Sequence, residues 1–552
     1  MTSDNAESRF LRPPSDTEYP PQYRAASSYS PLNTFLLPQG DARHYQQQYS
    51  DMYFLRLAKL KPAAEQVGRE AWDGFSIAGE HARRVERVLD VRQGELCWVV
   101  GTVYMDLPLK PNILDDVVKD HFTAAPPPRR TYVDPSNPSL TQIMLEDESG
   151  RLRLTGNVLR TTHLVTGVII AVLGTENSNG DFEVIDIKVP DFPPQPRRWG
   201  RAASDAVDSK LKQSDEQETK NRKGSTKIAF VSGLGITGSS SDALALELLT
   251  DYLLGYTGPS EGENEPCASR ISRLIVAGNS LGEAETVHAA GTDSAADGAP
   301  KKKTAPKKYG YDASAYNPSP ITRLDSFLSE ILPSIPVTLM PGETDPANFS
   351  LPQQGIHRAM LPRARAYCSE SRPGDENAEP GWFDSVTNPW EGYVEGWRLW
   401  GSSGQNVDDV LRYLDFADED GNVEAGDDGE TRLRIMEAML RWRCAVPTAP
   451  DTLWCYPFQT HDPFILQACP HIFFVGNQPQ FKTAVVESES TFRLNGTDAD
   501  MPDVTDDSLN PRVRLIAIPK FHETGELILV DTETLEVEVV KFEVFAGQEE
   551  KM

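Results

Sequence analysis

The fold of this chain is decided by the stretch Lys227-Ile228-Ala229-Phe230-Val231-Ser232-Gly233. Its apolar run ends in a glycine turn, which predicts a buried strand that leads into a loop. A helix is expected next at residues 242–254, then a second strand at 273–278 and a third at 335–340. Strands that alternate with helices in this way predict a layered α/β domain.

The same pattern continues to the C-terminus. A helix is expected at 431–443, because Leu433, Met436 and Leu440 fall on one side of it. Further strands are expected at 471–475, 513–518, 526–530 and 535–545. We therefore assign residues 226–552 to one α/β domain that ends in a β-rich segment.

The first half of the chain predicts an all-β unit behind one helix. The apolar spacing of residues 45–72 predicts an amphipathic helix that is broken near Pro62. Short strands with glycine-bearing turns follow, and their order fits an OB-fold barrel within a unit at 45–196. These strands are expected at 96–104, on either side of a tight turn within 142–154, at 164–173 and at 182–187.

Three segments are expected to lie outside the folded units. Residues 1–44 are rich in Ser, Pro and Tyr and predict a flexible arm, and 197–225 predict a charged linker. Residues 286–315 form a low-complexity insert in the α/β domain. The lysine cluster of this insert, between Lys301 and Lys308, is either a nuclear address or a solvated loop.

Composition excludes several classes of protein. The formal net charge of -28 argues against electrostatic wrapping of DNA, although it leaves room for a local basic patch. The N-terminal residues have no secretory pattern, and the longest apolar run is too short to cross a membrane, so an intracellular protein without a membrane segment is expected. The 6 cysteines include no C-x-x-C pair, so no zinc site and no cofactor is expected.

Two short motifs suggest chemistry and have ordinary structural explanations. Residues 278–282 match the G-x-S-x-G pattern of a nucleophile elbow, but no second glycine-rich oxyanion segment is obvious. Residues 232–238 resemble a phosphate loop but lack the lysine that a Walker loop needs. A tight strand-to-helix turn explains the second motif better.

A two-metal phosphoesterase would place D-x-H, G-D-x-x-D, G-N-H-[DE] and G-H-x-H at successive strand ends, because two divalent metals need that density of ligands. Here the strand ends are present without those ligands. None of the 9 histidines follows an Asp at a spacing of two, and neither G-N-H nor G-H-x-H occurs. We therefore expect no catalytic, metal or cofactor residues. The degenerate positions are Ser232, Leu234, Asn279, Glu343, Thr344, Asp345, Asn477 and Pro479.

An OB-fold followed by a disabled phosphoesterase domain resembles the B-subunit family of replicative DNA polymerases. Several stretches are similar to the delta branch of that family, over residues 45–545 in all. They are 251–255 (DYLLG), 339–354 (LMPGETDPANFSLPQQ), 401–409 (GSSGQNVDD), 447–453 (PTAPDTL), 455–458 (CYPF) with 462–464 (DPF), and 469–477 (CPHIFFVGN).

The resemblance implies a fold and a role. The implied fold is an OB-fold barrel followed by a calcineurin-like metallophosphoesterase-type α/β sandwich that lacks metal ligands. The implied role is that of a non-catalytic scaffold, which grips the cysteine-rich C-terminal domain of the polymerase delta catalytic subunit and also binds a third subunit. A nuclear location, possible sharing with polymerase zeta, and contact with DNA only through the holoenzyme are implied as well.

Two alternatives remain open at this point. One is an active metal-dependent phosphodiesterase or nuclease, against which the missing histidines argue. The other is a single-strand nucleic-acid-binding OB module, which would use stacked aromatics in a basic groove. The expected strands carry few aromatic and several acidic residues, so a protein-binding barrel is favoured. The residues of a partner interface do not follow from the sequence.

Overall fold

The computed structural model describes most of the chain between Arg24 and Glu543. The insert at 286–315 and most of the linker at 197–225 lie outside the described residues. The described residues are 24, 27–38, 40, 43, 49–77, 79–111, 131–134, 136–137, 140–198, 225–238, 243–257, 260–261, 265–282, 317–369, 381–414, 429–488 and 510–543.

Two six-stranded sheets form the centre of the α/β part. The first has the order β15-β14-β13-β10-β21-β22, with four parallel strands and an antiparallel pair at one side. Its strands are β10 (Lys227–Val231), β13 (Ile271–Ala277), β14 (Val337–Met340), β15 (Phe383–Ser385), β21 (Glu526–Asp531) and β22 (Val537–Lys541).

The second sheet has the order β1-β16-β17-β18-β20-β19, in which β17, β18 and β20 run parallel. Its strands are β1 (Tyr29–Pro31), β16 (Trp390–Val394), β17 (Trp397–Ser402), β18 (Ile472–Gln478), β19 (Lys482–Glu487) and β20 (Arg512–Pro519). The β16–β17 hairpin and β19 were not anticipated from the sequence. The strands expected at 471–475, 513–518 and 526–530 are confirmed.

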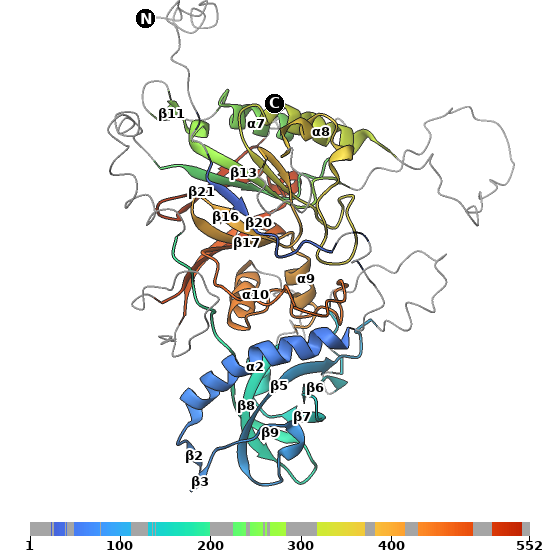
Figure 1. Ribbon diagram of the computed structural model, residues 1–552, viewed down its shortest axis with the longest axis vertical. Coiled ribbons are helices and arrows are strands. Elements are labelled where there is room, and N and C mark those ends of the chain that lie inside the picture. The colour runs from blue at the N-terminus through green and yellow to red at the C-terminus, as the bar shows by residue number, and fades with distance from the viewer. Residues whose placement is uncertain are drawn as a thin grey trace, which may run out of the picture.

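Helices cover both outer faces of this pair of sheets. α7 (Ala243–Leu254) and α8 (Ser319–Ile331) pack on the first sheet, and α9 (Gln405–Leu411) and α10 (Gly429–Arg441) pack on the second. Apolar side chains such as Phe230, Met340 and Phe474 fill the space between the sheets. The layers are stacked along the long axis of the molecule (Figure 1). This arrangement confirms the expected layered α/β part.

A closed barrel forms the other end of the molecule. Its order is β4-β5-β6-β7-β9-β8, and pairing of β5 with β8 closes it. The apolar run at 164–173 is not one strand as expected, since β8 begins at Ile169 after a buried turn. The strands are β4 (Arg83–Arg84), β5 (Leu96–Asp106), β6 (Gln142–Glu146), β7 (Arg151–Thr155), β8 (Ile169–Glu176) and β9 (Phe182–Lys188).

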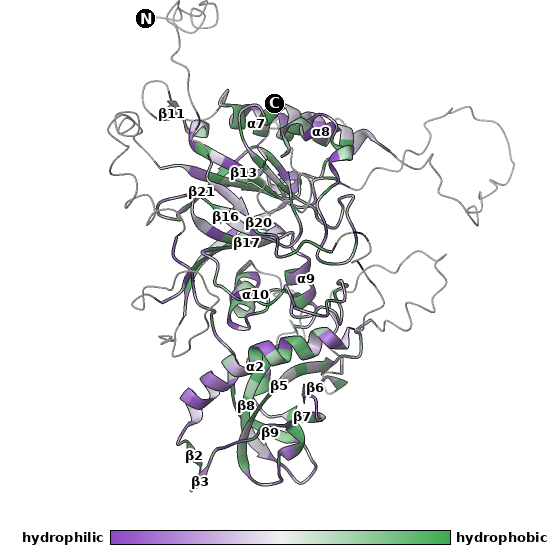
Figure 2. Cartoon of the chain, in the orientation of Figure 1, coloured by the Kyte–Doolittle hydropathy of each residue, from purple (hydrophilic) through white to green (hydrophobic). Residues whose placement is uncertain are grey.

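Helix α2 (Ser50–Trp72) lies across β5 and β8 on the outside of the barrel. The colours of Figure 2 show that it contains both apolar and polar residues, and its apolar residues join a cluster with Trp98 and Ile169. The expected break at Pro62 is wrong. Pro62 is exposed, so its ring faces solvent and the carbonyl left without a partner can bind water.

The short elements complete the description. They are β2 (Ser76–Ile77), β3 (Glu80–His81), η2 (Val88–Asp90), α4 (Val158–Thr161), β11 (Ser260–Glu261), β12 (Glu265–Pro266), η5 (Cys267–Arg270), η7 (Arg358–Met360), η8 (Ala364–Tyr367) and α11 (Phe521–Thr524). No helix within the described ranges has the length and apolarity that a membrane span requires.

A buried ion pair joins the barrel unit to the sandwich. Arg56 of α2 donates to the carboxylate of Asp462 at 2.8 Å and to the carbonyl of Pro447 at 2.7 Å. The two charged side chains are 2% and 0% exposed. Around them, one apolar cluster runs from the barrel interior through α9 and α10 to the second sheet. Barrel and sandwich therefore share a core.

The segment at 27–38 does not behave as a flexible arm. β1 pairs antiparallel with β16, and the ring of Tyr29 lies between Trp390 and the guanidinium of Arg273. Phe35 is buried in the shared core. The expectation of an arm over 1–44 is therefore wrong for residues 27–38, because their aromatic side chains bury apolar area against the sandwich. We call this segment the N-terminal strap.

Replacing Arg56 with Met should lower the free energy of unfolding by about 3–5 kcal/mol, because it leaves the buried carboxylate of Asp462 without its cation. The double variant Arg56→Met/Asp462→Leu should recover most of this loss. Urea unfolding followed by tryptophan fluorescence measures both. Arg83→Met is the control, since its exposed pair with Glu95 contributes at most about 1 kcal/mol. Equal losses of stability in Arg56→Met and Arg83→Met would show that the buried Arg56–Asp462 pair is no more important than an exposed one.

Candidate functional site

The candidate site lies where strands of both sheets end at one edge of the sandwich. The loop after β10 runs beside the loop after β13, and the two are joined by backbone hydrogen bonds. Gly233 N donates to Gly278 O at 2.9 Å, Gly235 N to Asn279 O at 3.2 Å, and Ile236 N to Ser280 O at 3.0 Å. Asn477 in β18 brings the second sheet to the same place. We call this group of loops the strand-end network.

Asp345, in the loop after β14, lies at the centre of the network. Its carboxylate accepts hydrogen bonds from the backbone N–H groups of Gly342 at 2.8 Å, Leu281 at 2.9 Å and Ser280 at 3.2 Å. Burial raises the pKa of Asp345 to about 6, although these hydrogen bonds act in the opposite direction. The carboxylate thus holds two loops together and already has backbone donors on both oxygens.

Asn477 links the two sheets. Its Nδ2 donates to the carbonyl of Ser403 at 2.7 Å, and its backbone N–H donates to the hydroxyl of Ser232 at 2.9 Å. Ser232 in turn donates to the carbonyl of Pro519 at 3.0 Å. Asn477 has a positive φ of 58°, which Asn tolerates better than most residues. The side-chain nitrogen of Asn477 therefore bridges the strands, while its Oδ1 is buried without a hydrogen-bond partner among the described residues.

A second polar group, not anticipated from the sequence, extends the network. Asn388 Nδ2 donates to Gln353 Oε1 at 2.8 Å, to Ser403 Oγ at 3.0 Å and to Gln405 Oε1 at 3.0 Å. All four side chains are buried or half-buried. The sequence does contain a clue, since a polar run directly follows β17. Predicting the β16–β17 hairpin would have placed that run at a strand end.

The two enzyme-like motifs have structural roles here. Ser280 is fully buried, and its hydroxyl has no hydrogen-bond partner among the described residues, so it has no base to activate it. The N–H groups of Gly233 and Gly235 bond the neighbouring loop rather than remaining available for phosphate. The geometry supports neither an acyl-transfer nucleophile nor a phosphate loop.

The structure brings together five of the eight positions identified from the sequence. Ser232, Asn279, Thr344, Asp345 and Asn477 all take part in the network, and Thr344 N donates to Asn279 Oδ1 at 3.3 Å. The side chains of the other three do not take part in it. Leu234 is in the apolar core under α7 and α8, whereas Glu343 and Pro479 are exposed.

These residues do not fit a pair of divalent cations. Such a pair needs several carboxylate and imidazole ligands that converge on a shared water. The one buried carboxylate of the network, Asp345, is bonded to backbone amides, and His522 Nδ1 lies 2.8 Å from the carbonyl of Gly233. Across the described ranges, no group of three or more His, Cys, Asp or Glu side chains is placed to hold a metal.

Comparison with known families finds two matches along the chain. The family described as the OB-fold domain of the DNA polymerase delta subunit matches residues 48–187, which contain α2 and the barrel. The family of the B subunits of DNA polymerases alpha and epsilon matches residues 228–483, within the sandwich.

Whole-length relatives show the same similarity. The chain is 34% identical over 518 residues to the DNA polymerase delta small subunit of Saccharomyces cerevisiae, which covers 91% of each chain. It is 32% identical over 525 residues to the small subunit of Oryza sativa subsp. japonica, covering 94% of this chain and 98% of the relative. It is 30% identical over 525 residues to DNA polymerase delta subunit 2 of Drosophila melanogaster, covering 95% and 99%.

The raised pKa of Asp345 makes a testable contribution to stability. Because the folded state binds this proton more tightly than the unfolded state, the contribution is complete below the unfolded pKa of 3.8 and is lost as the pH rises through about 6. Asp345→Asn removes the titration. The destabilisation that it causes should therefore shrink by about 1.4 kcal/mol between about pH 5 and pH 7.5.

Urea unfolding of the parent chain and of Asp345→Asn at both pH values measures this difference, and other titrating groups cancel in the comparison. A penalty that is constant, or that grows with pH, would show that Asp345 does not have a raised pKa.

Proposed function

The chain belongs to the family of DNA polymerase delta small subunits, accessory subunits in DNA replication, and from this premise we propose that it acts as a scaffold within the holoenzyme. In this proposal it grips the cysteine-rich C-terminal domain of the catalytic subunit and also binds a third subunit. The single observation that carries a non-catalytic role is the strand-end network, in which backbone N–H groups occupy both carboxylate oxygens of Asp345.

We further propose that the sandwich is a calcineurin-like phosphoesterase domain whose chemistry has been lost. Its two sheets, each covered by helices, and its polar loops at one edge support this assignment. The eight positions identified from the sequence would then be the degenerate ligand positions. In that view hydrogen bonds replace metal ions as the links between loops that follow different strands.

The proposed division into domains is 45–196 for the helix and OB-fold, 197–225 for the linker and 226–552 for the phosphoesterase-like domain. Within the described residues, the elements from α2 to β9 form the barrel unit, and those from β10 to β22 form the sandwich. The strap is an exception, since β1 belongs to the second sheet.

The proposed scaffold role also needs a stable surface on which partners assemble. The shared core and the buried Arg56–Asp462 pair support a fixed arrangement of barrel and sandwich. The net charge of -28 suits a basic, cysteine-rich partner module. A nuclear location and sharing with polymerase zeta remain part of this proposal.

The single-strand-binding alternative receives little support from the barrel. Its half-buried aromatic Tyr104 has the cation of Lys110 and that of Arg151 each 4.7 Å from its ring centroid. Lys110 also pairs with Asp451 of the sandwich. A ring already covered in this way is a poor platform for stacking a base.

Co-expression with the cysteine-rich C-terminal domain of a delta catalytic subunit should give a single stable species on size-exclusion chromatography that persists in moderate salt. An obligate interface of this class buries upwards of roughly 2,000 Å², which resists salt. The same domain expressed without this chain is the control. Separate elution of two folded proteins would contradict the scaffold role.

The purified chain should show no Mn²⁺-dependent hydrolysis of a phosphodiester such as bis(p-nitrophenyl) phosphate above the rate in buffer, because the strand ends offer no metal pair. Manganese-dependent hydrolysis that is lost in Asn477→Ala would instead establish the phosphodiesterase alternative.

A further inference from the structure

One face of the sandwich carries positive charge in an otherwise strongly acidic chain. The sequence from 346 to 369 contains no Asp or Glu, although the chain has 82 of them. It contains four basic side chains, and all four are exposed on η7 and η8 or beside them. They are His357, Arg358, Arg363 and Arg365.

A fifth basic side chain comes from helix α8, to which η8 is fixed by Asp325. The buried carboxylate of Asp325 accepts hydrogen bonds from the backbone N–H groups of Arg363, at 3.0 Å, and Ala364, at 2.9 Å. The guanidinium of Arg363 donates to Ser326 Oγ at 2.9 Å. Arg323 lies one turn before Ser326, so both arginines border the same stretch of α8. We call these five side chains the basic face.

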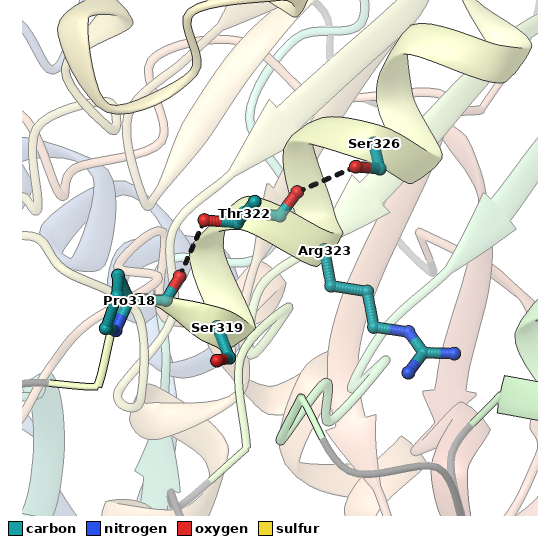
Figure 3. A pocket seen from close by; sticks show the side chains of 5 residues that line it. All are labelled: Pro318, Ser319, Thr322, Arg323 and Ser326. Atoms are coloured by element: carbon teal, nitrogen blue, oxygen red, sulfur yellow. Dashed lines mark hydrogen bonds between the residues drawn. The ribbon is translucent and has the colours of Figure 1, made fainter.

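A shallow surface pocket adjoins the basic face. It has a volume of about 370 Å³ and is lined by Pro318, Ser319, Thr322, Arg323 and Ser326. Figure 3 shows that the hydroxyls of Thr322 and Ser326 point back to carbonyls of their own helix, whereas Arg323 extends away from it. The pocket is therefore a hollow whose hydroxyls are already bonded, and the arginines supply the charge that would recognise a ligand.

Among the described residues, two members of the basic face lack an acidic partner. Arg358 and Arg365 form no ion pair with any residue in the described part of the chain. Asp325 is occupied by backbone amides, and Asp384 accepts from the phenol of Tyr29 in the strap. Glu330 lies two turns further along α8. A surface that keeps uncompensated arginines in a chain of net charge -28 points to an anionic ligand.

We propose that the basic face contacts the phosphodiester backbone of duplex DNA. Arginine suits this ligand because its planar guanidinium donates two parallel hydrogen bonds to a phosphate. A duplex presents regularly spaced charges that several arginines can engage together, with release of counterions. A single strand is the poorer fit, since no aromatic residue lies between His357 and Arg365 and Tyr367 beyond them is half-buried.

This contact goes beyond the scaffold role. The net negative charge of the chain limits its affinity. The overall charge of -28 repels DNA at long range, so the free chain should bind weakly. A holoenzyme already held on DNA by its catalytic subunit raises the effective concentration of the duplex at this face. The basic face would then add to retention on DNA without acting as a primary DNA-binding site.

The test uses fluorescence anisotropy of a labelled duplex of about 20 base pairs with the full-length chain, from about 50 to about 200 mM salt. Arg358→Glu/Arg365→Glu should weaken binding at least about tenfold at the lowest salt and reduce the slope of log affinity against log salt by about 1.8. Both side chains are exposed, so the fold should tolerate the change, and a thermal melt checks this. The neutral variant Arg358→Gln/Arg365→Gln should lose the same slope with a smaller loss of affinity.

The matched control is Lys59→Glu/Arg92→Glu, which makes the same change of charge at exposed positions on α2 and the barrel unit. It should bind like the parent chain apart from a small general loss. Equal losses in the two glutamate variants would overturn the proposal, because net charge alone would then explain binding. No binding by the parent chain, tighter binding to a single strand, or equal binding to polyglutamate would overturn it as well.

Discussion

The guanidinium of Arg56 is the group on which the arrangement of the two halves depends. It lies on the helix that covers the barrel, and its partners Asp462 and Pro447 belong to the sandwich. Gly167 lies against this group, where a Cβ would be 2.0 Å from the carbonyl of Pro447. A buried pair of this kind contributes little net stability but is costly to break, so it favours one docking geometry over others. The apolar cluster around it supplies most of the favourable energy.

The strand-end network ties the loops at one edge of the sandwich together with hydrogen bonds. Where a strand ends, backbone N–H and C=O groups lose their partners in the sheet and need others. Polar side chains at these positions can supply them. A metal would satisfy them by coordination. Here the side chains of Asp345, Asn477 and Asn388 each form hydrogen bonds with a residue of another loop. The resulting edge is held together by hydrogen bonds within the chain itself.

Much of the fold followed from local pattern. The strands at β10, β13 and β18 were predicted because buried strands are apolar runs that end in turns. The hairpin of β16 and β17 was missed because its tryptophans alternate with Glu, Gly and Arg, and its burial depends on partners far away in sequence. For the same reason the strap was expected to be an arm, and the Asn388 group of the site was missed. The positions around Asp345 were identified, but their hydrogen-bond partners depend on long-range geometry that no local pattern encodes.

The strap is synthesised long before the residues that it packs against. Tyr29 is separated by 355 positions from Asp384, the acid that accepts the hydrogen bond of its phenol. At usual rates of translation, the strap leaves the ribosome roughly 20 to 70 s before its partner strand is made. The strap is thus synthesised early but can pair only after β16 has been made. Until then β1 has no strand to pair with, and unpaired edges of this kind are where nascent chains associate wrongly.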